Sequence, residues 1–355
     1  MVWLPFKQVG KEMMKNVYVV MWLCALTLCG SCAAPWEKKS GNGLVLHTDF
    51  CWKTTPVKQQ GDSQWCWMYA MLATIETDRL LLGDSVHLSV PYPMRGYLAD
   101  ATKVCYLSCG KKEISDRGMA PTALHLIAEN GLVSYDAYRV QQVHGYRHLL
   151  QQLAQRARYS HSLEELNSRT TRLFDETLGP TPTAVYFAGV QYTPIEFAHS
   201  VCKPGSYISL TSFTHHPFGT SFILELPDNV RHDSFRNMPL QSLMDTIIST
   251  LQSGHAVCWE GDISDPGFSF EKGIADVPPL QRKASQALRQ RAFACRQTTD
   301  DHCMALVGMA HDEAGRRYFI AKNSWGTANP YGGFMYLSED YVRLKTIAVT
   351  LLAEY

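Results

Sequence analysis

Residues 56–70 read PVKQQGDSQWCWMYA and set Cys66 between Trp65 and Trp67, at the start of an apolar run that continues to Ile75. This run predicts a helix that begins near Cys66. Free backbone N–H groups and the helix dipole stabilise a thiolate at such a position. Cys66 is therefore a candidate nucleophile. The alternative is a buried structural cysteine, which is a common fate for this residue type.

Gln60 lies six residues before Cys66, in a loop that turns through Gly61. From this loop a side-chain amide would reach back toward the start of the helix. There it would share an oxyanion with the backbone N–H of Cys66.

A second motif lies far downstream and supplies partners for a nucleophile. Residues 300–309 read DDHCMALVGM and residues 317–326 read RYFIAKNSWG, with a turn from Asp312 to Gly315 between them. Each half is typical of a short β-strand, and His302 begins the first strand while Asn323 follows the second. A hairpin would bring His302 and Asn323 to the same end.

A nucleophilic thiol needs a base and a third group that holds the base in the useful tautomer. Cys66, His302 and Asn323 fill these three roles. Taken alone, His302 would be an ordinary polar residue. The combination is far more specific.

These residues, Gln60, Cys66-Trp67, His302 and Asn323-Ser324-Trp325-Gly326, resemble the papain superfamily of cysteine peptidases in order, type and context. The separation of 302 − 66 = 236 residues is much longer than in papain or a cathepsin. The segments in this gap resemble the bleomycin hydrolase (aminopeptidase C) branch. The resemblance runs from about Thr55 to about Thr350.

The resemblance implies an α+β, papain-like two-lobe fold, with a helical lobe facing a β-barrel-like lobe across the active-site cleft. The peptidase domain would span residues 35–355, with a large, mostly helical insertion at about 83–253. Trp67 and Trp325 would support the site, with Trp325 covering the His302–Asn323 hydrogen bond. Gly118 would line the non-primed substrate subsites.

The implied function is hydrolysis of peptide bonds through a thioester acyl-enzyme, with a peptide or protein as the substrate and no cofactor or metal. Two alternatives stay open. One is another thiol acyl transferase or amidase with the same residues, and the other is a catalytically silent exported protein that binds peptides.

The composition supports a large globular protein of 355 residues, 46% of them hydrophobic and 19% charged. Its 33 basic and 33 acidic residues give no net charge. We therefore expect no nucleic-acid partner. The oligomeric state is not indicated.

The N-terminus has the parts of a secretory signal peptide over residues 1–34: three lysines, an apolar run from Val17 to Cys29, and small residues at its exit. We expect export to the periplasm, the cell surface or the medium. Cys32 follows Gly30-Ser31 and would instead anchor a lipoprotein if it were acylated. The membrane is a partner only in that case.

Of the eleven cysteines, seven remain beside Cys66 and the three in the leader. Cys105 and Cys109 are close enough for a local disulfide, which the sequence leaves open. His215 and His216 invite a metal site, but no third ligand stands at a telling distance in the sequence. We therefore expect no metal.

The last expected strand, residues 346–352, is followed by only three residues. In bleomycin hydrolases a longer arm continues from this point into the cleft. A chain without such an arm is expected to have an open cleft and endopeptidase or mixed activity. The insertion would preserve aminopeptidase action if it caps the non-primed side.

Overall fold

The computed structural model describes residues 44–139 and 145–353, which all belong to one compact unit. The expected leader at residues 1–34, with Cys32, lies outside this part of the chain. Within the described ranges, no helix has both the length and the apolar character needed to cross a membrane.

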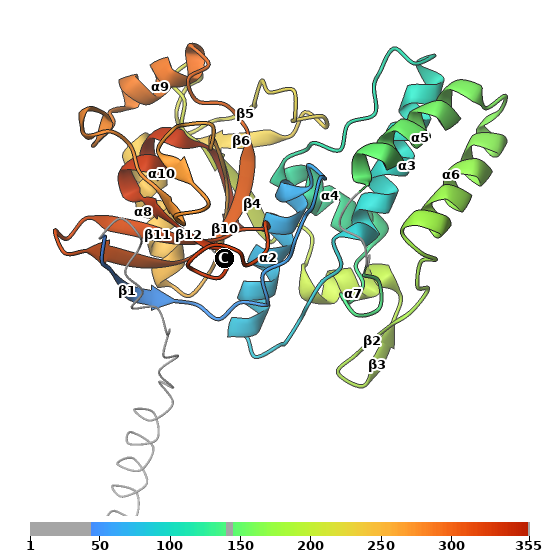
Figure 1. Cartoon of the computed structure of the whole chain (residues 1–355), viewed down its shortest axis with the longest axis horizontal. Helices are drawn as coiled ribbons and strands as arrows, with labels where there is room; N and C mark the ends of the chain where they lie inside the picture. The colour runs from blue at the N-terminus through green and yellow to red at the C-terminus, as the bar shows by residue number, and fades with distance from the viewer. Residues whose placement is uncertain (1–43, 140–144, 354–355) are drawn as a thin grey trace, which may run out of the picture. The chain divides into compact units, whose positions relative to one another are not determined.

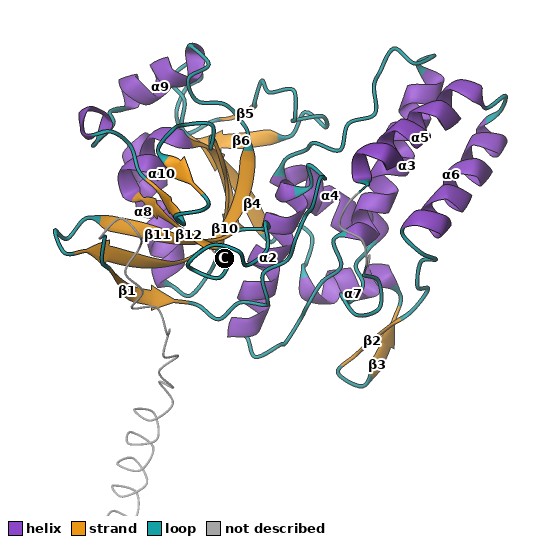
Figure 2. Ribbon diagram, in the orientation of Figure 1, coloured by secondary structure: helices purple, strands orange, loops and turns teal. Residues whose placement is uncertain are grey.

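An eleven-stranded sheet forms one half of this unit (Figures 1 and 2). In chain order its strands are β1 (Leu46–Cys51), β4 (Tyr207–Thr211), β5 (Ser221–Ile223), β6 (Ser234–Asn237), β7 (Val257–Gly261), β8 (Phe268–Ser269), β9 (Ile274–Ala275), β10 (His302–Asp312), β11 (Arg317–Lys322), β12 (Phe334–Ser338) and β13 (Thr346–Leu352). They lie in the order β5-β6-β4-β13-β7-β10-β11-β12-β9-β8, and β1 pairs with β10. All pairs are antiparallel except β4 with β6 and β12 with β9.

The central strands β7 and β10 are buried on both faces, so their sequences are nearly continuous apolar runs. Alternate residues of a strand point to opposite faces. Val257 and Trp259 of β7 belong to a core formed mainly by the sheet and helices packed on it. Cys258 of β7 and Cys303 of β10 instead belong to the core shared with the other lobe.

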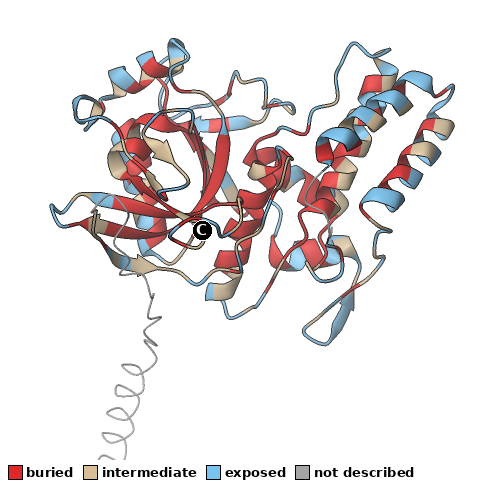
Figure 3. Ribbon diagram, in the orientation of Figure 1, coloured by how far each residue is buried: buried red, intermediate tan, exposed pale blue. Residues whose placement is uncertain are grey.

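The second half of the unit is helical. The helix α2 (Cys66–Leu81) lies between the sheet and a group formed by α3 (Pro91–Leu107), α4 (Ala120–Asn130), α5 (Tyr146–Tyr159), α6 (Leu163–Thr177) and α7 (Pro194–Val201) (Figure 1). Figure 3 shows that α2 is buried over most of its length, whereas α5 and α6 expose their outer faces. Three further helices, α8 (Leu240–Gln252), α9 (Gln286–Ala294) and α10 (Glu339–Lys345), accompany the sheet.

Glu76, in the buried helix α2, binds residues from the loop before this helix, from the segment after it and from β11. Its carboxylate accepts hydrogen bonds from Lys58 Nζ at 2.6 Å and from the Leu88 N–H at 2.6 Å. The Lys322 ammonium, at the end of β11, lies 4.0 Å from the other oxygen. Burial opposes the charge, but Lys58 and Lys322 hold the pKa of Glu76 below its usual value. The helix that carries Cys66 is thus tied to the hairpin that carries His302.

This architecture confirms the expected α+β fold with a helical lobe and a sheet lobe. The helix α3 was not predicted from the sequence, because Pro91, Pro93 and Gly96 interrupt its pattern. Nor were α10 and a small hairpin formed by β2 (Val185–Phe187) and β3 (Val190–Tyr192).

Cys105 lies near the end of α3, and Cys109 follows that helix. Both are free thiols. The local disulfide that their spacing allowed is therefore not formed in this structure.

Candidate active site

Cys66 is the first residue of α2 and is half-buried. Trp65, at the N-cap position, makes no side-chain hydrogen bond to the helix. The N–H groups of a first helical turn have no acceptor within the helix. The Cys66 thiol therefore lies where the backbone stabilises negative charge, as the sequence predicted.

The hairpin of β10 and β11 brings His302 and Asn323 together. Ala305 pairs with Lys322 in this antiparallel ladder, so the start of β10 and the end of β11 meet at one edge. His302 begins β10, and Asn323 directly follows β11. Both side chains are buried, with 3% of each residue exposed.

The hydrogen bonds of Asn323 fix the roles of the His302 ring nitrogens. Asn323 Oδ1 accepts from the Ser324 N–H at 2.7 Å, which identifies this atom as the amide oxygen. The same oxygen lies 2.7 Å from His302 Nε2, so Nε2–H donates to it. In the neutral ring this leaves Nδ1 as the nitrogen that can accept a proton.

Cys66 interacts with His302 and with the thiol of Cys303. A hydrogen bond from the Cys303 side chain, helped by a hydrogen bond and positive charge from His302, lowers the pKa of Cys66 well below its usual value, although burial opposes this. The arrangement favours a thiolate at Cys66.

The Gln60 side chain is held at both ends of its amide. Its Nε2 donates to the Ser63 carbonyl at 2.8 Å, and its Oε1 accepts from Ser324 Oγ at 2.6 Å. An amide nitrogen carries two hydrogens. One N–H of Gln60 therefore remains for an oxyanion, in a side chain whose orientation is fixed.

Trp67 and Gly118 lie against each other beside Cys66. Trp67 is buried, and its Nε1 donates to the Asp116 carbonyl at 3.1 Å. A Cβ at Gly118 would come within 2.9 Å of Trp67 Cε2. The Trp67 ring thus leaves no room for a side chain at position 118, so this position requires glycine.

Trp325 packs on the His302 ring, with their ring centroids 4.6 Å apart. Phe268 and Phe270 make edge-on contacts with the Trp325 ring, at centroid distances of 6.0 and 5.3 Å. This aromatic cover limits the access of water to the hydrogen bond between His302 and Asn323.

The contacts that Cys303, Ser324 and Glu260 make at this site were not predicted from the sequence. Cys303 directly follows His302, and that adjacency was the one available signal. Ser324 meets Gln60 across 264 residues of chain. Glu260, in β7, pairs in register with Cys303; burial, helped by the negative charge of Cys66, raises the pKa of Glu260.

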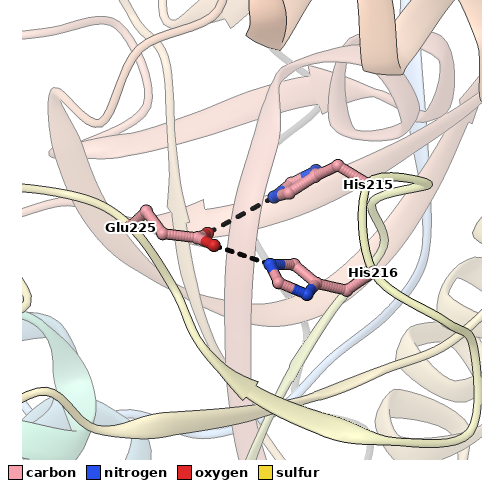
Figure 4. A group of neighbouring side chains, drawn as sticks. All are labelled: His215, His216 and Glu225. Carbon is pink, nitrogen blue, oxygen red and sulfur yellow. Dashed lines mark hydrogen bonds and ion pairs between the residues drawn. The ribbon is translucent and has the colours of Figure 1, made fainter.

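The structure corrects the expectation that His215 and His216 lack a third polar partner. Figure 4 shows both rings turned toward the carboxylate of Glu225. His216 Nε2 lies 2.6 Å from Glu225 Oε1, and His215 Nε2 lies 3.3 Å from Oε2. The three side chains form a candidate metal cluster on the surface.

The hydrogen bonds around His215 do not fit a metal at this cluster. Gln290 Oε1 accepts from the Thr214 N–H at 2.6 Å, so the Gln290 NH₂ group faces His215 Nδ1 at 3.1 Å. Nδ1 must accept, and the ring proton then sits on Nε2, which points to Glu225. A ligating histidine normally donates from its other nitrogen instead.

Residues 184–354 match the Peptidase C1-like family. Aminopeptidase W of Lactobacillus delbrueckii subsp. lactis is 27% identical over 169 residues, which are 45% of this chain and 38% of that protein. Aminopeptidase G of the same organism is 26% identical over 178 residues, which are 46% of this chain and 39% of that protein. The chain thus aligns with about two fifths of the length of these curated relatives.

The crystal structure of PepW from Lactobacillus rhamnosis HN001 resembles this structure with a TM-score of 0.66 at 15% identity. The match covers 99% of this chain and 93% of that one. It therefore extends the likeness in fold beyond the segment matched by the family model. The chain shares the α+β, two-lobe fold of PepW, and its residues 184–354 are similar to the Peptidase C1-like family.

Proposed function

We propose that this chain is a cysteine peptidase in which Cys66 is the nucleophile, His302 the acid and base, and Asn323 the group that orients His302. One observation carries the proposal. His302 Nε2 is bound to Asn323 Oδ1, while the same imidazole interacts with Cys66 at the start of α2.

In the first step, the Cys66 thiolate attacks the carbonyl carbon of the scissile peptide bond. The Cys66 N–H and the remaining N–H of Gln60 donate to the oxyanion that forms. The imidazolium at His302 gives its Nδ1 proton to the leaving amine, so the C–N bond breaks and a thioester remains on Cys66.

In the second step, neutral His302 takes a proton from a water molecule, which attacks the thioester. The thiolate leaves and the acid product is released. Asn323 keeps Nε2–H engaged throughout, so Nδ1 faces the reaction in both steps. The cover by Trp325 protects this orientation from competing water.

Labelling with an epoxysuccinyl inhibitor tests the nucleophile directly. We expect Cys66 to be modified rapidly at neutral pH and below, and Cys66→Ala to lose both the label and peptide hydrolysis. Cys109 and Cys295 are exposed free cysteines, so Cys109→Ser and Cys295→Ser serve as controls that retain the label. A folded Cys66→Ala protein that still cleaves peptides would overturn the assignment.

The end at which a peptide is cut is a separate part of the proposal. The relatives named aminopeptidases support removal of N-terminal residues. An open cleft would instead allow internal cleavage. The assay compares one peptide with its N-terminally acetylated form. Loss of cleavage on acetylation indicates aminopeptidase action, and equal cleavage at internal bonds indicates an endopeptidase.

We also propose that the mature protein is exported, because residues 1–34 have the pattern of a signal peptide. Mass spectrometry of the mature N-terminus tests this. A processed chain supports export, an acylated Cys32 indicates a lipoprotein, and an unprocessed cytosolic chain contradicts it.

A further inference from the structure

Glu260 extends from the sheet lobe to the helical lobe beside Cys66. Along β7, the Trp259 side chain points into the core of the sheet lobe. The side chains of Cys258 and Glu260 point to the opposite face, where Cys258 packs with α2. The strand partner of Glu260 in β10 is Cys303, the residue whose thiol contacts Cys66. The carboxylate of Glu260 therefore points into the interface between the lobes.

The two oxygens of this carboxylate differ in their surroundings. Oε1 accepts a hydrogen bond of 2.5 Å from the N–H of Ala120, the first residue of α4. Oε2 is buried and has no hydrogen-bond partner among the described residues. Capping α4 explains only Oε1, and a glutamine would perform that function equally well. Burying a second, unpaired carboxylate oxygen is costly.

Asp300 is a second acidic group beside the same thiol. It precedes His302 by two residues and is half-buried. Its main-chain oxygen, rather than its carboxylate, accepts from Arg117 Nη2 at 2.8 Å. Burial, followed by the negative charges of Glu260, Asp228 and Cys66, raises the pKa of Asp300 well above its usual value, although Arg117 opposes this.

Two of the other acidic groups nearby already have basic partners. Asp228 receives two hydrogen bonds from Arg117 Nε, at 2.9 and 2.7 Å. Asp233 lies 2.7 Å from His125 Nε2. Burial, with the charges of Cys66, Asp228 and Asp233, raises the pKa of Glu260 to about 8, against the hydrogen bond from Ala120. Burial and mutual repulsion thus favour the neutral forms of Glu260 and Asp300 in the free protein, and a bound cation would favour their ionised forms.

We propose that Glu260 and Asp300 form an acidic subsite that binds a cationic group of the substrate next to Cys66. Asp300 meets the group at the half-exposed edge, and Glu260 Oε2 supplies the second acceptor as the group enters. Because Glu260 binds the N–H of Ala120, this subsite lies beside the segment of Gly118. Gly118 is expected to line the non-primed substrate subsites. The inference rests on the proposed peptidase function and names the substrate feature that it selects.

The cationic group has two possible sources, the free N-terminal ammonium of a peptide or a lysine side chain. Two pairs of fluorogenic dipeptide amides separate them. Acetyl-Lys-Ala is compared with acetyl-Nle-Ala, in which norleucine removes only the charge. Free Nle-Ala is compared with acetyl-Nle-Ala. The preference in each pair is the ratio of kcat/KM for the cationic substrate to that for the neutral one.

In the unsubstituted protein we expect the kcat/KM ratio of at least one pair to favour the cationic substrate at least tenfold. In the double variant Glu260→Gln with Asp300→Asn, we expect this ratio to fall at least tenfold. Glu260→Gln keeps an acceptor for the Ala120 N–H, and Asp300→Asn alone is the second test if the double variant is unstable. Asp245→Asn removes an exposed carboxylate of α8 and should leave the preference unchanged. Equal kcat/KM values in both pairs, or a preference that survives both substitutions, would overturn the proposal.

Binding to the Cys66→Ala protein tests the subsite without turnover. Calorimetry with the same three peptides, unlabelled, should show the same preference in Kd, lost in the Glu260→Gln and Asp300→Asn background. A Cys66 that takes no epoxysuccinyl label, with no hydrolysis of any substrate, counts against the peptidase function. A labelled, active protein with no preference for the cationic peptide counts against the subsite alone.

Discussion

Ser324 Oγ donates a 2.6 Å hydrogen bond to Gln60 Oε1 and so joins the loop before α2 to the segment after β11. The Gln60 N–H also donates to the Ser324 carbonyl, at 2.8 Å. These two hydrogen bonds connect the chain segment that leads to Cys66 with the segment that carries Asn323. Gln60 and Asn323, the proposed oxyanion donor and orienting group, are therefore positioned by one connection.

Ser324→Ala should lower kcat by about two- to tenfold with little change in KM, because one buried hydrogen bond of about 0.5–1.5 kcal/mol no longer fixes Gln60. Gln60→Ala should cost more, on the order of a hundred- to a thousandfold, because an oxyanion donor is lost. Steady-state kinetics on a peptide amide measure both, with Ser249→Ala on the surface of α8 as the control. If Ser324→Ala reduced the rate equally in the Gln60→Ala background, it would not act through Gln60.

Asn323→Ala should weaken activity less than His302→Ala does. In the proposed mechanism His302 transfers the proton in both steps, and general acid–base catalysis contributes on the order of 10²–10⁴-fold. Asn323 only holds Nε2–H, so its loss leaves a base that is present but misoriented part of the time. The kcat values of both variants, compared at matched stability, check the order. Equal losses would mean that Asn323 does more than orient the ring.

The positions of Cys66, His302 and Asn323 at the ends of a helix and two strands could be predicted from the sequence, as could the loop that carries Gln60; their catalytic roles stay a prediction. A helix start, a strand start and a strand end can be read from local patterns. The structure then placed these ends together, as the predicted hairpin required.

Ser324, Cys303 and Glu260 could not be assigned in the same way. Cys303 and Glu260 lie within apolar runs, and their orientation depends on the pairing of β7 with β10. Ser324 acts on a residue from the other end of the chain. Such roles follow from strand register and long-range packing, which a single sequence does not specify.

Cys303→Ala should raise the pKa of Cys66, because the thiolate loses a hydrogen-bond donor. The rate of alkylation by iodoacetamide, followed against pH, should therefore move its midpoint upward. Cys303→Ser keeps a donor and should restore most of the shift. Cys258→Ala is the matched control, since Cys258 is buried on the same face. An unchanged profile for Cys303→Ala would rule out this contact.

Glu76→Gln should destabilise the protein by about 3–5 kcal/mol at pH 7, because Lys58 and Lys322 lose their buried counter-charge. The pKa of Glu76 is lowered in the folded state, so its contribution to stability is present above 4.5, the ordinary pKa of a glutamate, and is lost as pH falls through the lower folded value. Urea unfolding at pH 7 and pH 4 measures both effects. The difference between wild type and variant should shrink at the lower pH. A constant difference would exclude this titration as the cause.

Gly118→Ala should lower kcat/KM, because the new Cβ would lie 2.9 Å from Trp67 Cε2 and must displace the ring next to Cys66. The backbone at Gly118 is outside the left-handed region, so the effect comes from contact alone. Overpacking of this kind typically costs about 1–3 kcal/mol. The smaller ring of Trp67→Phe offers a compensating background, in which Gly118→Ala should have a weaker effect. Unfolding curves, with kinetics on the same peptide amide, measure the four proteins. An equal effect of Gly118→Ala in both backgrounds would show that the Trp67 ring is not what excludes a side chain from this position.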